Sequence, residues 1–294
     1  MNLIRITAVT APPSPIELLE LRPVVFAVAE LGLLAVAGGL LGAWIVLRRL
    51  AFFTHAAGTA TFPGLVLAEA GAFSPRLAAL VVALGFAGGV ERAGRRGRDP
   101  GDVATALLLV AALAGGVVLA SDVFESGAAV DRLLFGTAVG LDWGDLLLSG
   151  AACLLALGTT VGLGRAWTAA GFDPEGADSM GLPSSRADLL LLVTIAVAVV
   201  AALPAVGALL VSSIFVVPAA IARLFATSVT GLLRSAVLVA AAQGTLGLYL
   251  ALWLDVPPGP AVSVLGAGAY AACALAKAPS SRRRGPLPAA RATA

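Results

Sequence analysis

Long apolar stretches separated by few charges constrain this chain more than any other feature of its sequence. No charged residue occurs between Asp188 and Arg223, and 59% of the 294 residues are hydrophobic whereas 12% are charged. Water-soluble domains carry about 25% charged residues, so this chain lies outside that class. A helix needs about 20 mostly apolar residues to cross a bilayer. The sequence therefore predicts an all-α protein that spans the membrane several times.

Charges, prolines and glycine turns divide the apolar sequence into about nine predicted spans, with eight as the alternative. The nine cover residues 23–47, 54–72, 75–91, 103–121, 143–164, 188–204, 206–222, 232–253 and 259–276. The breaks at 73–75 and around Pro204 are short, so neighbouring spans could be joined or divided there. Glycine and alanine cluster inside the spans, which favours close packing of the helices in a bundle.

The distribution of arginine predicts the orientation of the bundle, because basic residues in short loops stay on the cytoplasmic side. In the nine-span arrangement one side receives most basic residues, namely Arg48, Arg49, the cluster at 91–98, Arg165, Arg186, Arg223, Arg234 and the C-terminal tail. The other side receives Asp122, Glu125, Asp131 and Asp255, with Arg132 as the main exception. We therefore expect the N-terminus outside and the C-terminus inside.

Three regions follow from this orientation. Residues 1–22 are expected to form an extracytoplasmic segment without the pattern of a cleavable signal peptide. Residues 23–276 form the transmembrane domain. Residues 277–294, rich in Arg, Pro, Ala and Ser, are predicted to be a disordered basic cytoplasmic tail.

Residue counts exclude several classes of enzyme. The only lysine, Lys277, precedes Ala-Pro, so the chain has no Walker A motif with which to bind ATP. The only histidine is His55, so zinc-hydrolase motifs and multi-histidine metal sites are absent. Transport is therefore the default function for such a bundle, with an intramembrane enzyme or a structural bundle as the remaining alternatives. Glu30, the carboxylate well inside a span, supports an alternative in which a secondary carrier binds a proton or a sodium ion there.

The longest predicted cytoplasmic loop has the pattern of a short helix. It reads AAGFDPEGADSMGLPSSR, residues 169–186. Asp173 is a favourable N-cap, Glu175 suits the positive end of the helix dipole, and Gly181 followed by Pro183 would end the helix. A helix this short is not stable alone, so the loop is predicted either to dock onto a partner or simply to connect two spans.

Five stretches, taken in order, carry a resemblance to a known family. They are LLGAWIVLRRLAFFTHAAGTATFPGLVLA, DRLLFGTAVGLDWGDLL, GFDPEGADSMGLP, AVGALLVSSIFVVPAAIARLFATS and LALWLDVPPGPAV. From about Leu31 to Ala276 the chain resembles the membrane permease subunit of zinc/manganese/iron-type metal ABC importers, the ABC-3 family. The resemblance implies an importer subunit in the bacterial cell (inner) membrane that is not itself an enzyme.

The resemblance also implies partners. These are a second permease copy, a cytoplasmic ABC ATPase dimer and an extracytoplasmic metal-binding solute-binding protein, with membrane lipid around the bundle. We expect no nucleic-acid partner and no permanently bound cofactor, only the transported divalent metal. In this family the segment matching 172–182 is the coupling helix that docks into the ATPase. Its candidate ATPase-coupling residues here are Asp173, Glu175, Asp178, Met180, Gly181 and Leu182.

A polar stripe is predicted on the second span. His55, Thr59 and Pro63 are spaced i, i+4 and i+8, which places them on one face of a continuous helix. Pro63 would remove a backbone hydrogen bond and expose a carbonyl, which is tolerated in a membrane only where protein or water satisfies it. The stripe is typical either of a metal pathway or of helix packing with a kink.

The same stretch departs from the family it resembles. The family commonly shows Gly-Asp and then Ser-His, where this chain has Thr54-His55 and Gly58-Thr59. Imidazole suits zinc, whereas manganese prefers carboxylate and other oxygen ligands. We therefore expect zinc to be favoured over manganese or iron, with His55 as a transient metal ligand.

Overall fold

The long apolar runs of the sequence fold into α-helices, as expected. The computed structural model describes residues 22–71, 73–94, 101–123, 136, 140–173, 184–208 and 210–278. All regular elements in these residues are helices: α2 (Arg22–Leu47), α3 (Ala51–Thr59), α4 (Phe62–Gly71), α5 (Pro75–Gly94), α6 (Gly101–Val123), α8 (Trp143–Phe172), α10 (Ser184–Val206), α11 (Val211–Phe225), α12 (Val229–Leu254) and α13 (Pro258–Lys277). The all-α fold class is confirmed.

Seven of the described helices are long and apolar enough to cross a membrane, namely α2, α5, α6, α8, α10, α12 and α13. The span predicted at 206–222 corresponds to α11, a shorter apolar helix of 15 residues. The span predicted at 54–72 corresponds to two short helices, α3 and α4. Every predicted span thus has a helical counterpart, while the number that cross the membrane stays a prediction.

The second predicted span differs from the expected continuous helix. Backbone between Ala60 and Thr61 forms a turn that ends α3 and begins α4. The Thr61 hydroxyl donates to the Gly58 carbonyl at 2.6 Å, so a side chain satisfies an oxygen at the end of α3. Pro63 falls in the first turn of α4, where a helix requires no backbone donor. The interruption therefore precedes Pro63 rather than being a kink at that residue.

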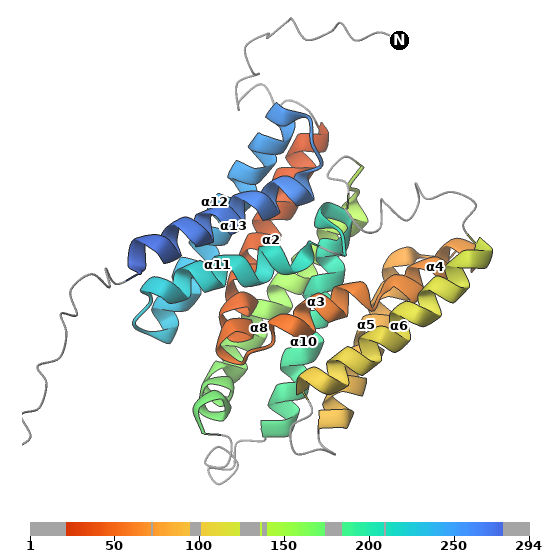
Figure 1. Ribbon diagram of the computed structural model, residues 1–294, viewed down its shortest axis with the longest axis horizontal. Coiled ribbons are helices and arrows are strands. Elements are labelled where there is room, and N and C mark those ends of the chain that lie inside the picture. Colours follow the sequence, from red (N-terminus) through yellow and green to blue (C-terminus); the bar gives the residue numbers. More distant parts are fainter. Residues whose placement is uncertain are drawn as a thin grey trace, which may run out of the picture.

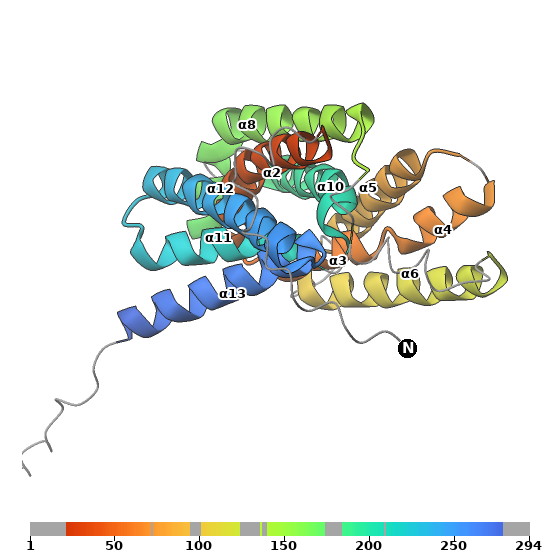
Figure 2. The same cartoon turned by 90° about the horizontal axis from the view of Figure 1, so that it is seen from above.

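Helix α2 is the central element of one group of helices. It packs against α8, α11 and α12, as Figures 1 and 2 show. Glycine permits the close approach: a Cβ at Gly42 would lie 2.1 Å from the Phe215 carbonyl oxygen, and one at Gly39 would lie 2.4 Å from the Val237 Cα. Small residues on α2 thus provide the tight helix packing that the sequence predicted.

A second group consists of α4, α5 and α6, which pack on one another at one side of the molecule (Figure 1). Helix α5 joins this group to α10, and α3 contacts α6, α10 and α11. Helix α3 therefore lies between the two groups, and this position places His55 where the groups meet.

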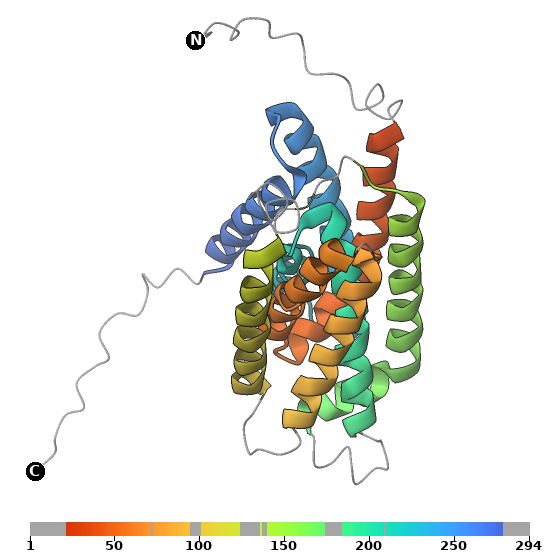
Figure 3. The same ribbon diagram turned by 90° about the vertical axis from the view of Figure 1, so that its right-hand side faces the viewer.

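The helix directions agree with the predicted topology. In Figure 3, α2 and α8 begin near the upper end of the molecule, whereas α6 and α10 begin at the lower end. Helix α8 has 30 residues, so it is about 45 Å long at 1.5 Å per residue. A hydrocarbon core is about 30 Å thick, so α8 extends beyond it. Which end faces the cytoplasm stays a prediction.

Candidate functional site

Helix α3 carries two residues of the predicted polar stripe. His55 is half-buried, and no hydrogen bond joins its imidazole to another residue in the part of the chain that the structure describes. The Thr59 side chain is buried, and its hydroxyl donates to the His55 carbonyl oxygen at 3.1 Å. That bond occupies the hydroxyl proton and leaves oxygen lone pairs. A nitrogen and an oxygen atom that could each contact a metal therefore lie one turn apart on α3.

Pro63, the third residue of the stripe, lies on the far side of the turn that separates α3 from α4. It is half-buried, and α6 approaches it closely, because a Cβ at Gly116 would lie 3.1 Å from the Pro63 nitrogen. The three residues therefore lie on two helices rather than on one continuous face. Their predicted role in a metal pathway stays a prediction.

The described residues contain no group of three or more His, Cys, Asp or Glu side chains that could hold a metal ion. A structural zinc site takes four protein ligands. His55 and Thr59 offer fewer metal-binding atoms than that within one chain.

Glu30 lies in a different place, inside the first group of helices. Its side chain on α2 is fully buried, and the Ser149 hydroxyl of α8 donates to its Oε1. Ser149 Oγ also lies 3.4 Å from the Ala201 carbonyl oxygen of α10. Glu30 Oε2 has no hydrogen-bond partner among the described residues. The Glu30–Ser149 pair therefore joins α2 to α8 beside α10, and Glu30 is separate from the His55 stripe.

An ion-pair cluster at the start of α8 was not found by sequence reasoning. Arg76 of α5 contacts Asp142 at 2.6 Å and Asp145 at 2.7 Å. The two aspartates also cap α8 reciprocally, since each carboxylate accepts the other's backbone N–H at 3.0 Å. The hydrogen bond from Arg76 lowers the pKa of Asp142. The pattern Asp-Trp-Gly-Asp was a capping signal, but it did not indicate Arg76 as the partner.

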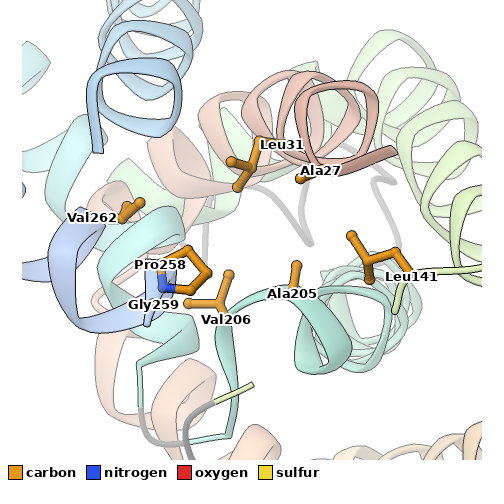
Figure 4. Close-up of a pocket in the computed structure, with 8 residues that line it drawn as sticks. All are labelled: Ala27, Leu31, Leu141, Ala205, Val206, Pro258, Gly259 and Val262. Atoms are coloured by element: carbon orange, nitrogen blue, oxygen red, sulfur yellow. The ribbon is translucent and has the colours of Figure 1, made fainter. Parts of the chain in front are cut away.

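Two hollows lie near these groups. A groove beside the ion-pair cluster is lined by Leu65, Pro75, Arg76, Ala79, Asp145, Val200, Leu203 and Pro204. Figure 4 shows the other, a small cavity between α2, α10 and α13 that is lined by Ala27, Leu31, Leu141, Ala205, Val206, Pro258, Gly259 and Val262. No titratable side chain lines the small cavity, so its side chains offer no metal ligand.

The predicted coupling helix lies mostly outside the described residues. Glu175, Asp178, Met180, Gly181 and Leu182 are not described. Asp173 is described: it follows α8 in an extended conformation, and its N–H donates to the Ala169 carbonyl at 2.9 Å. Helix α8 therefore ends where the predicted coupling helix would begin, and that helix stays a prediction.

Comparison with known proteins adds a family match to this geometry. The family model described as the ABC 3 transport family matches residues 21–277. Relatives include the manganese transport system membrane protein MntC of Halalkalibacterium halodurans, 26% identical over 81% of this chain and 82% of the relative. They also include the high-affinity zinc uptake system membrane protein ZnuB of Haemophilus influenzae, 23% identical over 77% of this chain and 87% of the relative.

Solved structures share the fold. PsaBC from Streptococcus pneumoniae in complex with Fab superposes with a TM-score of 0.77 at 22% identity, covering 88% of this chain and 94% of that one. An inward-facing conformation of a putative metal-chelate type ABC transporter gives a TM-score of 0.70 at 16% identity, covering 92% of each chain.

Proposed function

Because the chain belongs to the ABC 3 transport family, we propose that it is the membrane permease subunit of an ATP-driven importer for a divalent transition metal. The match over residues 21–277 carries this proposal, since it includes all the described helices. The protein is a multi-pass membrane protein of the bacterial inner membrane. It is not an enzyme, and a separate subunit hydrolyses the ATP.

Partners complete the proposed importer. A second permease copy, a pair of cytoplasmic ATPase subunits and an extracytoplasmic solute-binding protein would assemble with this chain. The metal-chelate type ABC transporter that shares its fold supports an assembly with ATPase subunits. We propose that residues 172–182, including Asp173, contact the ATPase.

Zinc is the metal that we propose, over manganese or iron. The relatives include both manganese and zinc uptake proteins, so they do not decide between these metals. The support is chemical: His55 offers an imidazole, which suits zinc, and Thr59 adds a neutral oxygen rather than a carboxylate. With so few donors on one chain, we propose that the metal passes His55 without being held tightly.

Uptake by reconstituted complexes tests the proposal. Proteoliposomes containing the permease, its ATPase and its binding protein should take up radiolabelled zinc only when ATP is supplied, and faster than manganese. Uptake that needs no ATP and follows a proton or sodium gradient would instead support the carrier that uses Glu30. ATP-driven uptake with manganese preferred would retain the importer and overturn the choice of zinc.

A further inference from the structure

The ends of α2 and α8 and the start of α10 are joined through one arginine. Arg48 Nη2 donates to Asp188 Oδ1 of α10 at 2.7 Å, and Nη1 donates to the Trp167 carbonyl oxygen of α8 at 3.4 Å. The Trp167 indole N–H donates in turn to the Ala187 carbonyl oxygen at 2.8 Å. We call Arg48, Trp167, Ala187 and Asp188 the Arg48 clamp. Its hydrogen bonds hold three helix ends together.

Helix α8 is shaped to receive this arginine. Gly164, Trp167 and Gly171 lie on one face at spacings of three and four residues. A Cβ at Gly171 would lie 3.1 Å from Arg48 Cδ, and one at Gly164 would lie 3.2 Å from the Trp44 ring. The Trp44 and Trp167 rings meet edge to face with centroids 5.4 Å apart. The clamp is therefore a packed interface rather than an isolated surface ion pair.

The chemistry of the clamp suits a firm connection. The Arg48 side chain is only 15% exposed, whereas that of Asp188 is 38% exposed. Hydrogen bonds between charged groups are stronger than neutral ones, and the pair is partly shielded from water. The fork of a guanidinium can hold two helices at once, which the single ammonium of lysine does less well.

The clamp lies between two parts of the proposed importer. Trp167 is in the last two turns of α8, and Asp188 is near the start of α10, so the clamp holds both helices that flank the proposed coupling segment. Arg48 directly follows α2, and α3, which carries His55, begins at Ala51. Few residues therefore separate the clamp from the candidate pathway.

We propose that Arg48 is a positioning residue that transmits movement from the α8–α10 connection to α3. When the ATPase displaces the ends of α8 and α10, the hydrogen bonds of the clamp move the turn between α2 and α3. Helix α3 moves with that turn. Without the arginine, the Trp44–Trp167 packing keeps the helices together, but the ion pair between Arg48 and Asp188 of α10 is lost. This role rests on the proposed function, because it requires an ATPase.

Transport per ATP is the first measurement. In reconstituted complexes, Arg48→Gln should lower the metal transported per ATP hydrolysed by about fivefold while ATP hydrolysis stays within about twofold of wild type. Arg48→Lys should give an intermediate ratio. Asp188→Asn should lower the ratio in the same direction, and the double variant should be no worse than Arg48→Gln alone, because both substitutions break the Arg48–Asp188 ion pair. Arg49→Gln is the matched control: it removes the same charge from the exposed neighbouring residue and should leave the ratio unchanged.

The second measurement is the change in reactivity of a thiol on α3 when the ATPase is trapped with nucleotide. It does not depend on metal transport. A single thiol is placed at exposed Phe52 by Phe52→Cys in a chain carrying Cys153→Ser and Cys273→Ser. Trapping the ATPase with ATP and vanadate should change the labelling rate of this thiol. Arg48→Gln should abolish the change, whereas Arg49→Gln should preserve it.

The outcomes separate the two proposals. A wild-type transport ratio together with a preserved nucleotide response in Arg48→Gln overturns the role of Arg48. If the wild-type complex transports no divalent metal yet the response of α3 depends on Arg48, the importer proposal fails and the transmission role stands. If Arg48→Gln does not assemble, Asp188→Asn leaves α2 unaltered and decides the question by the same two measurements.

Discussion

At the scale of single residues, His55 carries the most specific chemistry. Its imidazole is half-buried and lacks a hydrogen-bond partner among the described residues, although a polar ring inside a span is costly unless it meets water, a polar group or a cation. A neutral imidazole offers one lone pair, which can contact a passing metal. Glu30 differs, since Ser149 already occupies one of its oxygens.

We predict that His55→Leu lowers ATP-driven zinc uptake several-fold without affecting expression, dimer formation or ATPase docking. Leucine is of similar size but has no lone pair for the metal. His55→Asp should restore uptake with a shift toward manganese, because a carboxylate suits manganese better. Uptake of radiolabelled zinc and manganese measures both effects, with Phe52→Leu on the same helix as control. Wild-type rates in His55→Leu would reduce His55 to a packing residue.

At the scale of elements, the start of α8 shows how a local capping signal gains a distant partner. Asp142 and Asp145 cap α8 with each other's backbone, and Arg76 ties that cap to α5. Asn is as good an N-cap as Asp, whereas Ala is not. Substitutions at Asp142 can therefore separate the cap from the ion pair.

We predict that Asp142→Ala lowers stability by about 1 kcal/mol more than Asp142→Asn, since only Ala removes the cap. The loss in Asp142→Asn should stay below about 1 kcal/mol because the Asp142 side chain is 58% exposed. Arg76 lowers the pKa of Asp142, so the ion pair stabilises the fold fully above the ordinary pKa of 3.8. This stabilisation is lost as the pH falls through the lowered pKa. Thermal unfolding in detergent at several pH values measures the contributions of the cap and of the ion pair. Equal stability of Asp142→Ala and Asp142→Asn would contradict the capping role.

The packing face of α2 is a second feature at this scale. A Cβ at Gly42 would meet the Phe215 carbonyl oxygen, whereas a Cβ at Gly32 on the same helix would have nothing within 4 Å. Gly42→Ala is therefore expected to cost about 1–3 kcal/mol through overpacking. Gly32→Ala should be neutral or slightly stabilising, because alanine favours helix over glycine. Thermal unfolding compares the two variants. Equal melting temperatures would show that α11 shifts to accommodate the added methyl group at Gly42.

At the scale of the whole molecule, the two helix groups and the directions of their helices agree with the topology predicted from arginine placement. In that predicted topology the N-terminus lies outside, and the ends of α5, α8 and α11 are expected to face the cytoplasm. The predicted orientation would also put the Arg48 clamp on the side of the proposed ATPase.

Cysteine labelling tests this topology. In a chain with both native cysteines replaced by serine, Gly127→Cys should react with an impermeant thiol reagent from outside the cell. Gly97→Cys should react only after the membrane is opened, because it lies in the arginine-rich loop. Labelling of both thiols from the same side would show the topology to be wrong.

The sequence by itself determined the class of the protein and the places of its helices. Only a helix or a closed barrel satisfies backbone polar groups inside a bilayer. Each long apolar run was therefore expected to form a helix, and its position in the sequence was nearly fixed. The resemblance carried by five ordered stretches also predicted the family that the comparison confirms. His55 and Glu30 could be singled out because polar residues inside spans are rare.

Only the tertiary structure decided which of these residues meet. Glu30 and Ser149 are 119 residues apart, and Arg48 and Asp188 are 140 apart, so no local spacing could pair them. The turn between α3 and α4 likewise contains a hydrogen bond from the Thr61 hydroxyl to the Gly58 carbonyl oxygen, a contact that a rule based on Pro63 alone does not predict. The physical reason is that apolar helices in lipid have no hydrophobic drive to choose neighbours, so their partners are set by close-fitting shapes and a few polar contacts between distant segments.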